Sequence, residues 1–283
     1  MIIIKQASEL KKYLRKRAEN GSKIGFVPTM GALHEGHLAL VQTSLDETDF
    51  TVVSIFVNPT QFNDPKDFEK YPITVDEDIR LLEETGCHLL FLPSVEEIYP
   101  QSTQLAQPYE LGALEKVWEG YYRPGHFQGV CQVVHRLLQL VEPSTLIMGL
   151  KDYQQCMVVQ SLLEITGLYT KITLRPCPTL RETDGLAMSS RNRRLSETDR
   201  QKAPILYQTL QQIATDLPKG NSEAILKHHT QALIKQGFKP DYIGLADAKT
   251  LEPIKEWNNK QAAVLLMAVF LGEVRLIDNL LVQ

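Results

Sequence analysis

The stretch of residues 26–37 constrains the fold more than any other part of the chain. An apolar run there ends at Pro28 and Gly31, two histidines follow three residues apart, and a helical pattern continues to about residue 46. This order predicts a strand, a glycine-rich turn and the N-terminus of a helix. Backbone N–H groups and the helix dipole favour an anion at such a turn, and glycine permits close approach to a phosphate.

Two familiar motifs with similar spacing are excluded. Gly31 and Gly36 have the spacing of a P-loop, but His37 and Leu38 replace its lysine and hydroxyl residue. A zinc protease needs histidines at i and i+4 on a helix, whereas His34 and His37 lie at i and i+3. The remaining pattern, H-x-G-H after a strand, resembles the nucleotidylyltransferase superfamily, in which both histidines contact ATP phosphates. The motif alone does not exclude the alternative that both histidines are solvated residues of a loop.

Composition excludes several classes of protein. The chain has 283 residues and a net charge of −4, which allows one large or two modest domains and gives no basic footprint for nucleic acid. The apolar start is too short for a signal sequence, and no apolar run approaches a membrane span. Its four cysteines form no C-x-x-C pair, as is typical of reduced thiols. We therefore expect a cytoplasmic protein that binds neither nucleic acid nor a membrane.

Alternating strand and helix patterns predict an α/β fold. Strands are expected at 23–27, 50–57, 88–92, 145–148 and 171–177. Helices are expected from a cap at Ser8, after the opening turn, from a capping box at Thr74 to Gly86, after 123–126, and from Asp152 to Gly167. This alternation predicts a doubly wound, Rossmann-like parallel sheet. Ligands bind beyond the carboxyl ends of the strands in such sheets.

A polar, glycine-containing segment at 178–194 marks a domain boundary. We expect a Rossmann-like, ligand-binding domain over 1–182 and a smaller α+β domain over 183–283 that acts as a lid. Helices are expected from Ser196 and over 221–236 in the second domain. Its strands are expected at 242–243, 262–271 and 274–277.

Five motifs stand in order along the chain. They occupy residues 28–37 (PTMGALHEGH), 58–62 (NPTQF), 123–127 (RPGHF), 149–155 (GLKDYQQ) and 184–192 (DGLAMSSRN). Together they resemble the pantoate–β-alanine ligase family over essentially the whole chain, which implies that the domain over 1–182 binds ATP and pantoate. This chain departs from the usual family residues at two positions: it has Met148 where Phe is usual and Ile73 where Arg is usual.

The resemblance implies the ligands of the site. ATP contacts are implied for Pro28, Thr29, Met30, Gly31, His34, Gly36, His37, Gly149, Leu150, Lys151, Asp152, Leu180, Met188, Ser189, Ser190 and Arg191. Pantoate contacts are implied for Gln61, Gln155, Asn58 and Met30, with Gln61 also at β-alanine. Catalytic roles are implied for His34, His37, Lys151 and Arg191. The resemblance also implies Mg²⁺ accompanying ATP, no protein metal site, and a homodimer.

The implied reaction has two steps. The pantoate carboxylate attacks the α-phosphorus of ATP and gives pantoyl adenylate and pyrophosphate, and the amine of β-alanine then gives pantothenate and AMP. A carboxylate is ionised at neutral pH, so the first step needs positioning and stabilisation of phosphate charge rather than a base. Gln61 and Gln155 are neutral donors that orient a carboxylate without neutralising it. Arg123 and His126 receive no assigned role.

Two other functions use the same motif. A nucleotidylyltransferase acting on a phosphate-bearing acceptor should place extra Arg or Lys near the loop at 58–62, which has none. A non-catalytic ATP-binding regulator could lose catalytic groups, yet all four implied here are present. The remaining histidines, His88, His135, His228 and His229, are expected to be structural.

Overall fold

The computed structural model describes residues 1–63, 65–105 and 107–282, and the chain divides into two compact units. The first comprises Met1–Gly112, Arg123–Leu150 and Gln155–Pro178. The second comprises Ala113–Tyr122, Lys151–Gln154 and Thr179–Gln283. Two short segments, Ala113–Tyr122 and Lys151–Gln154, thus belong with the C-terminal unit although they come earlier in the sequence. The boundary between residues 182 and 183 stays a prediction.

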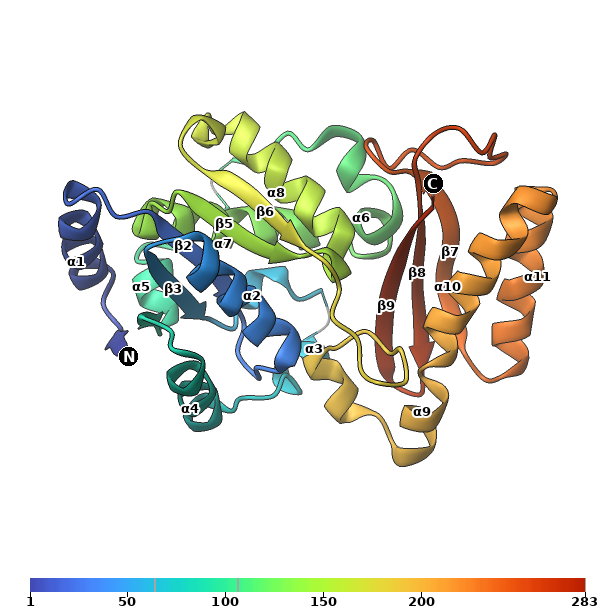
Figure 1. Ribbon diagram of the computed structural model, residues 1–283, viewed down its shortest axis with the longest axis horizontal. Coiled ribbons are helices and arrows are strands. Elements are labelled where there is room, and N and C mark those ends of the chain that lie inside the picture. Colours follow the sequence, from blue (N-terminus) through green and yellow to red (C-terminus); the bar gives the residue numbers. More distant parts are fainter. Residues whose placement is uncertain (64, 106, 283) are drawn as a thin grey trace. The chain divides into compact units, whose positions relative to one another are not determined.

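A six-stranded parallel sheet forms the centre of the first unit (Figure 1). Its strands are β1 (Ile2–Ile4), β2 (Ile24–Thr29), β3 (Phe50–Ile55), β4 (Leu89–Phe91), β5 (Thr145–Gly149) and β6 (Thr173–Cys177). They lie in the order β1-β4-β3-β2-β5-β6. The predicted parallel sheet is confirmed, and the five predicted strands agree with the structure to within two residues at each end.

β1 is a strand that the sequence did not predict. A three-residue apolar run has no period to read. The strand forms because it pairs with β4, with Ile2 opposite Leu89 and Ile4 opposite Phe91. Its existence therefore depends on a partner almost ninety residues away in the sequence.

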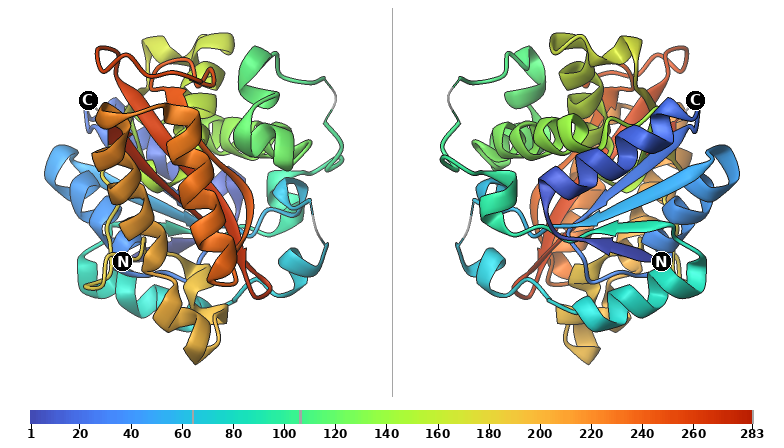
Figure 2. Two further views of the ribbon diagram at one scale, coloured as in Figure 1. Left: turned by 90° about the vertical axis from the view of Figure 1, so that its right-hand side faces the viewer. Right: turned by 90° about the vertical axis from the view of Figure 1, so that its left-hand side faces the viewer.

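Helices cover both faces of this sheet (Figures 1 and 2). The helices of the first unit are α1 (Ala7–Glu19), α2 (Glu35–Glu47), α3 (Pro65–Glu69), α4 (Val75–Thr85), α5 (Val95–Ile98), α7 (His126–Val141) and α8 (Tyr153–Ile165), with short 3₁₀ turns η1 (Pro59–Gln61) and η4 (Leu168–Thr170). α2 packs on β2, β3 and β5 and touches α4, while α7 packs on β2 and touches α1. The chain leaves β2 toward β3 and β4 on one side and later continues through β5 and β6 on the other. The carboxyl ends of β2 and β5 therefore form the topological switch point of the sheet.

One predicted helix cap is wrong and another lacks its hydrogen bond. α1 begins at Ala7, so Ser8 lies inside the helix, and the Ala7 N–H donates to Glu97 Oε2 at 2.8 Å. Thr74 is the N-cap residue of α4, as predicted, but its side chain makes no capping hydrogen bond; its hydroxyl donates to Asp78 Oδ1 at 3.1 Å. The predicted stop of α4 at Gly86 is confirmed, since Gly86 adopts the left-handed conformation at φ 86°.

The second unit contains a three-stranded antiparallel sheet and helices, as predicted for a small α+β domain. The strands β7 (Lys239–Asp247), β8 (Ala263–Leu271) and β9 (Val274–Val282) pair in chain order. Its helices and turns are η2 (Gly112–Glu115), α6 (Trp118–Tyr122), η3 (Leu150–Asp152), η5 (Ser190–Arg194), α9 (Glu197–Lys202), α10 (Ile205–Asp216), η6 (Leu217–Lys219) and α11 (Ser222–Lys235). α10 was not predicted, and it supplies Leu206, Leu210 and Ile213 to the core.

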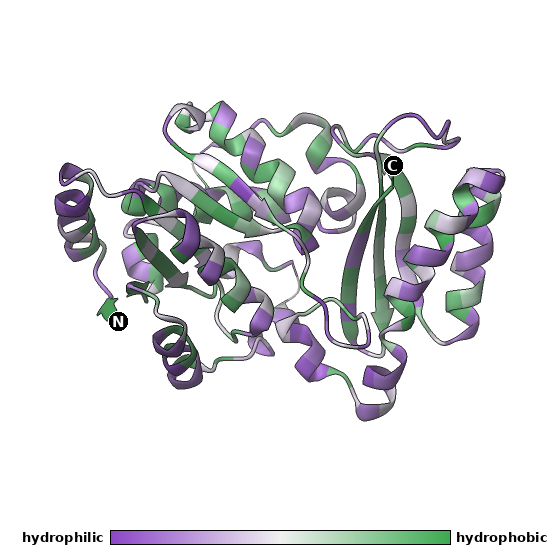
Figure 3. Cartoon of the chain, in the orientation of Figure 1, coloured by the Kyte–Doolittle hydropathy of each residue, from purple (hydrophilic) through white to green (hydrophobic). Residues whose placement is uncertain are grey.

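Hydropathy follows this architecture. Figure 3 shows hydrophobic residues along the strands and hydrophilic residues along α1 and α4. All six residues of β3 are buried, as expected for a strand covered on both faces. Within the described residues, no helix combines the length and apolar character needed to cross a membrane.

The pKa of His88 links folding of the first unit to pH. Its ring Nδ1 accepts the Thr51 N–H at 3.0 Å, and the ring stacks on that of Phe50 with 5.0 Å between the centroids. Burial, and then the positive charge of Arg17, lower the pKa of His88 below its usual value of 6.5. Below about pH 6.5 the unfolded chain therefore binds more protons at this residue than the folded chain, so stability falls as the pH is lowered there.

We expect urea denaturation to show lower stability at pH 5.5 than at pH 7.5. His88→Gln removes one group whose pKa differs between the folded and unfolded states, so its stability should change less between these pH values. An equal change in wild type and His88→Gln would show that His88 contributes nothing to the pH dependence.

Candidate functional site

The first part of the candidate site lies at the switch point of the parallel sheet. β2 and β5 pair with Gly25 opposite Thr145 and Phe26 opposite Leu146. Because the two strands run parallel, the motif that follows β2 and the motif that begins at Gly149 lie at the same end of adjacent strands. Thr29 is buried, and its hydroxyl donates to the Ser54 carbonyl oxygen at 2.8 Å. This bond ties the end of β2 to β3.

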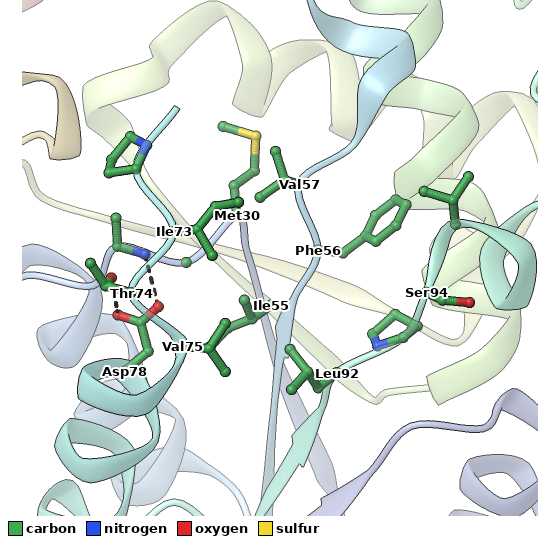
Figure 4. A pocket seen from close by; sticks show the side chains of 15 residues that line it. Met30, Ile55, Phe56, Val57, Ile73, Thr74, Val75, Asp78, Leu92 and Ser94 are labelled. Atoms are coloured by element: carbon green, nitrogen blue, oxygen red, sulfur yellow. Dashed lines mark hydrogen bonds between the residues drawn. The ribbon is translucent and has the colours of Figure 1, made fainter. Parts of the chain in front are cut away.

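A buried carboxylate holds the turn after β2. Asp78 on α4 is 1% exposed and accepts from the Ala32 N–H at 2.9 Å and the Leu33 N–H at 2.8 Å. Figure 4 shows Asp78 between this turn and Thr74, whose hydroxyl supplies a third bond. Gly31 has φ 81°, and a Cβ there would lie 3.0 Å from Asp78 Oδ2, so glycine is required by both conformation and space.

These bonds correct the predicted source of anion binding. The sequence suggested that N–H groups of the turn would face a phosphate, but they have partners within the protein. Besides the two that Asp78 accepts, the Gly31 N–H donates to Thr29 Oγ1 at 3.2 Å. The Gly36 N–H donates to His34 Nδ1 at 3.2 Å. The turn therefore serves to place the two histidines of the motif.

His34 and His37 form a pair at the N-terminus of α2. His34 is the N-cap residue, and the two ring centroids lie 4.0 Å apart at an angle of 35°. Because His34 Nδ1 accepts the Gly36 N–H, the ring proton of neutral His34 is on Nε2. The predicted grouping of these histidines at a helix start is confirmed, and their side chains can donate to an anion near that start.

The loop after β3 brings Gln61 to Met30. Gln61 Nε2 donates to Met30 Sδ at 2.8 Å, so two residues implied at pantoate lie in contact. Asn58 is 1% exposed, and its Nδ2 donates to Gln61 Oε1 at 3.3 Å and to the Gly129 carbonyl oxygen at 3.3 Å. Tyr99 donates to Asn58 Oδ1 at 2.9 Å. Asn58 thus orients Gln61 from a buried position.

Arg123 and His126 support the same loop. His126 is buried, and its Nδ1 donates to the Gln61 carbonyl oxygen at 2.8 Å. The Nη1 of Arg123 lies 3.1 Å from His126 Nε2, and Nη2 donates to the Gln61 carbonyl oxygen at 3.5 Å. Residues 58–62 contain no Lys or Arg, but folding supplies Arg123 to them. Arg123 therefore places near this loop a cation that the sequence of the loop itself lacks.

An apolar cavity of about 220 Å³ adjoins Met30 beyond the carboxyl ends of β3 and β4. Figure 4 shows Ile55, Val57, Leu92 and Ile73 around it. Ile73, at the position where the resemblance implies an arginine, is 77% exposed. The other unusual residue, Met148, is buried on β5.

The second unit carries Lys151 and Asp152 on η3. Lys151 Nζ lies 3.8 Å from Asp152 Oδ2, and the two side chains are 21% and 45% exposed. A partly exposed pair of this kind contributes about 0–1 kcal/mol to stability. The pair therefore does little to hold the fold and is available for a charged ligand. Leu150 and Gln155, on either side, are half-buried and belong to the first unit.

The segment containing Met188–Arg191 forms a compact hairpin rather than an open linker. Arg181 and Ala187 form an antiparallel bridge, and the Met188 N–H donates to the Leu180 carbonyl oxygen at 3.1 Å. Ser189 Oγ accepts the Arg191 N–H at 3.3 Å and caps η5. Leu180 is 42% exposed and Ser190 is buried. The backbone hydrogen bonds of this hairpin thus hold the implied phosphate-binding residues close to one another.

Several positioning residues escaped sequence reasoning. For Asp78 the sequence offered one indication of burial: it lies four residues before buried Leu82, on the apolar side of α4. Arg181, Asp278 and Asn279 had none, since their partners are distant in sequence. Asp278 and Asn279 are buried and Arg181 is half-buried; Arg181 binds Asp278, and Asn279 binds the backbone of Lys151.

Asp78→Asn should destabilise the first unit. The amide keeps one acceptor but turns an NH₂ donor toward a backbone N–H, which leaves a buried donor unsatisfied at a cost of about 1–3 kcal/mol. Asp76→Asn, an exposed change on the same helix turn, should cost no more than about 1 kcal/mol. Urea denaturation measures both variants, and hydrogen exchange at Ala32 and Leu33 should quicken only in Asp78→Asn. Equal stability of the two variants would contradict the role of Asp78.

Comparisons with known proteins identify the family of this chain. The family model described as "Pantoate-beta-alanine ligase" matches residues 2–281. Pantothenate synthetase of Porphyromonas gingivalis is 42% identical over 281 residues, which cover 99% of each chain. Pantothenate synthetase of Leptospira biflexa is 44% identical over 282 residues, which cover 99% of this chain and 98% of its relative.

Solved structures give the same answer. Pantothenate synthetase from Thermus thermophilus superimposes with a TM-score of 0.89 at 41% identity, covering 99% of each chain. The Francisella tularensis pantoate–β-alanine ligase, described as complexed with Beta-gamma ATP and Beta-alanine, has a TM-score of 0.84 at 38% identity. That alignment covers 99% of this chain and 97% of the other. Because sequence, fold and ordered motifs agree over nearly the full length, the chain belongs to the pantoate–β-alanine ligase family.

Proposed function

We propose that this chain joins pantoate and β-alanine to form pantothenate, with cleavage of ATP to AMP and pyrophosphate through pantoyl adenylate. The observation that carries the proposal is the His34–His37 pair at the switch point, with Gln61 in contact with Met30 in the same unit. Family membership over residues 2–281 supports it. The site thus combines donors suited to phosphate with a neutral donor suited to a carboxylate.

The adenylation step needs stabilisation of phosphate charge. Donors aimed at charge that develops in the transition state are the main source of such catalysis. We assign this role to His34, His37, Lys151 and Arg191, with the Ser189 and Ser190 hydroxyls at the leaving phosphates. The other ATP residues named from the motifs would bind the nucleotide around them.

Orientation of the nucleophile is assigned to the glutamines. The Gln61 side chain is held by Asn58 and Met30, so its amide has a fixed direction before any ligand binds. Gln155 is half-buried in the first turn of α8. A neutral amide can bind pantoate without reducing the charge of its carboxylate. We assign the β-alanine contact to Gln61 as well.

Mg²⁺ would arrive with ATP. Mg²⁺ prefers oxygen ligands, keeps several waters and is commonly held by substrate phosphates with one or two carboxylates. Asp152 is a carboxylate among the implied ATP residues, follows Lys151 in the sequence and has a side chain that is 45% exposed, so it would be the protein ligand of the ion. When bound, the ion would neutralise polyphosphate charge.

The rest of the proposal concerns organisation. We propose a cytoplasmic homodimer in which residues 183–283 act as a lid over bound nucleotide. A closed lid would keep water from the acyl adenylate, which water would otherwise hydrolyse before β-alanine attacks. The internal bonds of the hairpin at 180–191 suit a lid that moves as one body.

Product identification tests the function. Incubation with ATP, pantoate and β-alanine should give pantothenate, AMP and pyrophosphate, while ATP–pyrophosphate exchange should need pantoate and Mg²⁺ but not β-alanine. A parallel incubation with a phosphate-bearing acceptor tests nucleotidyl transfer. Nucleotidylated acceptor without pantothenate would overturn the proposal, and ATP binding without any product would indicate a regulator.

His37→Ala should lose about 10²–10³-fold in kcat with the fold intact, as is typical when one donor to transition-state charge is removed. His37→Gln keeps a neutral donor and should retain more activity. His228→Ala is a matched control, because this histidine lies on α11, outside every motif of the site. Wild-type kcat in His37→Ala would remove His37 from the mechanism.

A further inference from the structure

Two adjacent buried polar residues interrupt the apolar pattern of β9. Asp278 is 4% exposed and Asn279 is 9% exposed. Burial of a charge or an amide is costly unless hydrogen bonds compensate for lost water. The partners of this pair therefore indicate why an otherwise apolar strand carries them.

Asp278 holds Arg181. Arg181 Nη1 donates to Asp278 Oδ2 at 2.7 Å, and Nη2 donates to Oδ1 at 2.9 Å. This two-pronged geometry is stronger and more directional than a single contact. The Asn279 N–H donates to Asp278 Oδ1 at 2.8 Å and so fixes the carboxylate that Arg181 binds.

Arg181 is the base of the hairpin that presents Met188–Arg191. Its Nη1 also donates to the Gly185 carbonyl oxygen at 3.2 Å, and its guanidinium carbon lies 3.5 Å from the centroid of the Tyr207 ring. Its backbone pairs with Ala187. The side chain and the backbone of one residue thus fix the hairpin to β9.

Asn279 holds the other implied phosphate segment. Its Nδ2 donates to the Lys151 carbonyl oxygen at 2.9 Å. Consecutive strand residues point to opposite faces, so two adjacent residues can reach two separate segments. Lys151 and Arg181 are therefore tied to neighbouring positions of a single strand, although they are distant in the sequence.

We propose that Asp278 and Asn279 are positioning residues that fix the separation between the Lys151 segment and the Met188–Arg191 segment, so that both act on one polyphosphate. Neither residue needs to touch ATP. The inference rests on the proposed function, since it assumes that both segments bind the same nucleotide. It assigns to β9 a role that none of the five sequence motifs covers.

The test measures ATP–pyrophosphate exchange in Asp278→Asn, Asn279→Leu and the double variant. A displacement of catalytic donors by about 1 Å can cost about 10²-fold. We expect each single variant to lower kcat/KM for ATP by about 10- to 100-fold, with KM for pantoate near its wild-type value. Asp241→Asn is the matched control, because Asp241 accepts from a half-buried arginine of this sheet, Arg275, at 2.7 Å but carries no bond to either segment in the described part of the chain.

The double variant distinguishes shared from separate roles. If both residues maintain one separation, the double variant should lose little more than the worse single variant; independent roles would multiply the two losses. Unfolding midpoints and equilibrium ATP binding identify variants that only lost stability, and Asn279→Leu keeps the test valid if Asp278→Asn does not fold. Wild-type ATP kinetics in folded Asn279→Leu, or multiplied losses, would overturn the inference. Failure of wild type to exchange pyrophosphate would instead reject the proposed function, leaving ATP binding to test the inference.

Discussion

The first unit depends on the buried carboxylate of Asp78. Two unusual backbone conformations, at Gly31 with φ 81° and Ala32 with φ 48°, directly precede the histidine motif. The N–H groups of Ala32 and Leu33 would be costly to bury alone, and Asp78 accepts both. The carboxylate therefore accepts two N–H groups that the sequence suggested would face a phosphate. The direction in which His34 and His37 leave the turn follows from this bond.

The same principle recurs around Gln61. A loop that must present one amide in a fixed direction is anchored by buried polar groups rather than by apolar packing alone. Asn58 binds the Gln61 side chain, and His126 binds its backbone carbonyl oxygen. Gly129 lets α7 approach closely, since a Cβ there would lie 2.2 Å from the Thr60 carbonyl oxygen. Apolar contacts bring the elements together, and these directional bonds determine where one side chain points.

In the second unit, buried polar residues of the sheet likewise bind segments of the implied site. Alternate apolar residues of β8 and β9 belong to a core that α10 and α11 share. Asp278 and Asn279 are polar instead, and they bind segments that carry implied ATP residues. Buried polar groups reduce the apolar area available for stability, so their presence points to a requirement for geometry. Both units thus place functional side chains with buried polar residues outside the motifs.

The sequence by itself determined the strand–helix alternation, the parallel sheet and the motif residues, because periodicity, glycine and spacing are local signals. It also located the histidine pair at a helix start, where His34 is the N-cap. Only the tertiary structure decided which groups hold those residues. Asp78 lies 46 residues from Ala32, Asp278 lies 97 residues from Arg181, and Asn279 lies 128 residues from Lys151. β1 and the approach of Arg123 to Gln61 likewise depend on distant partners. Hydrogen bonds over such separations leave no periodic trace in the chain, because the tertiary fold and not the spacing along one element brings their partners together.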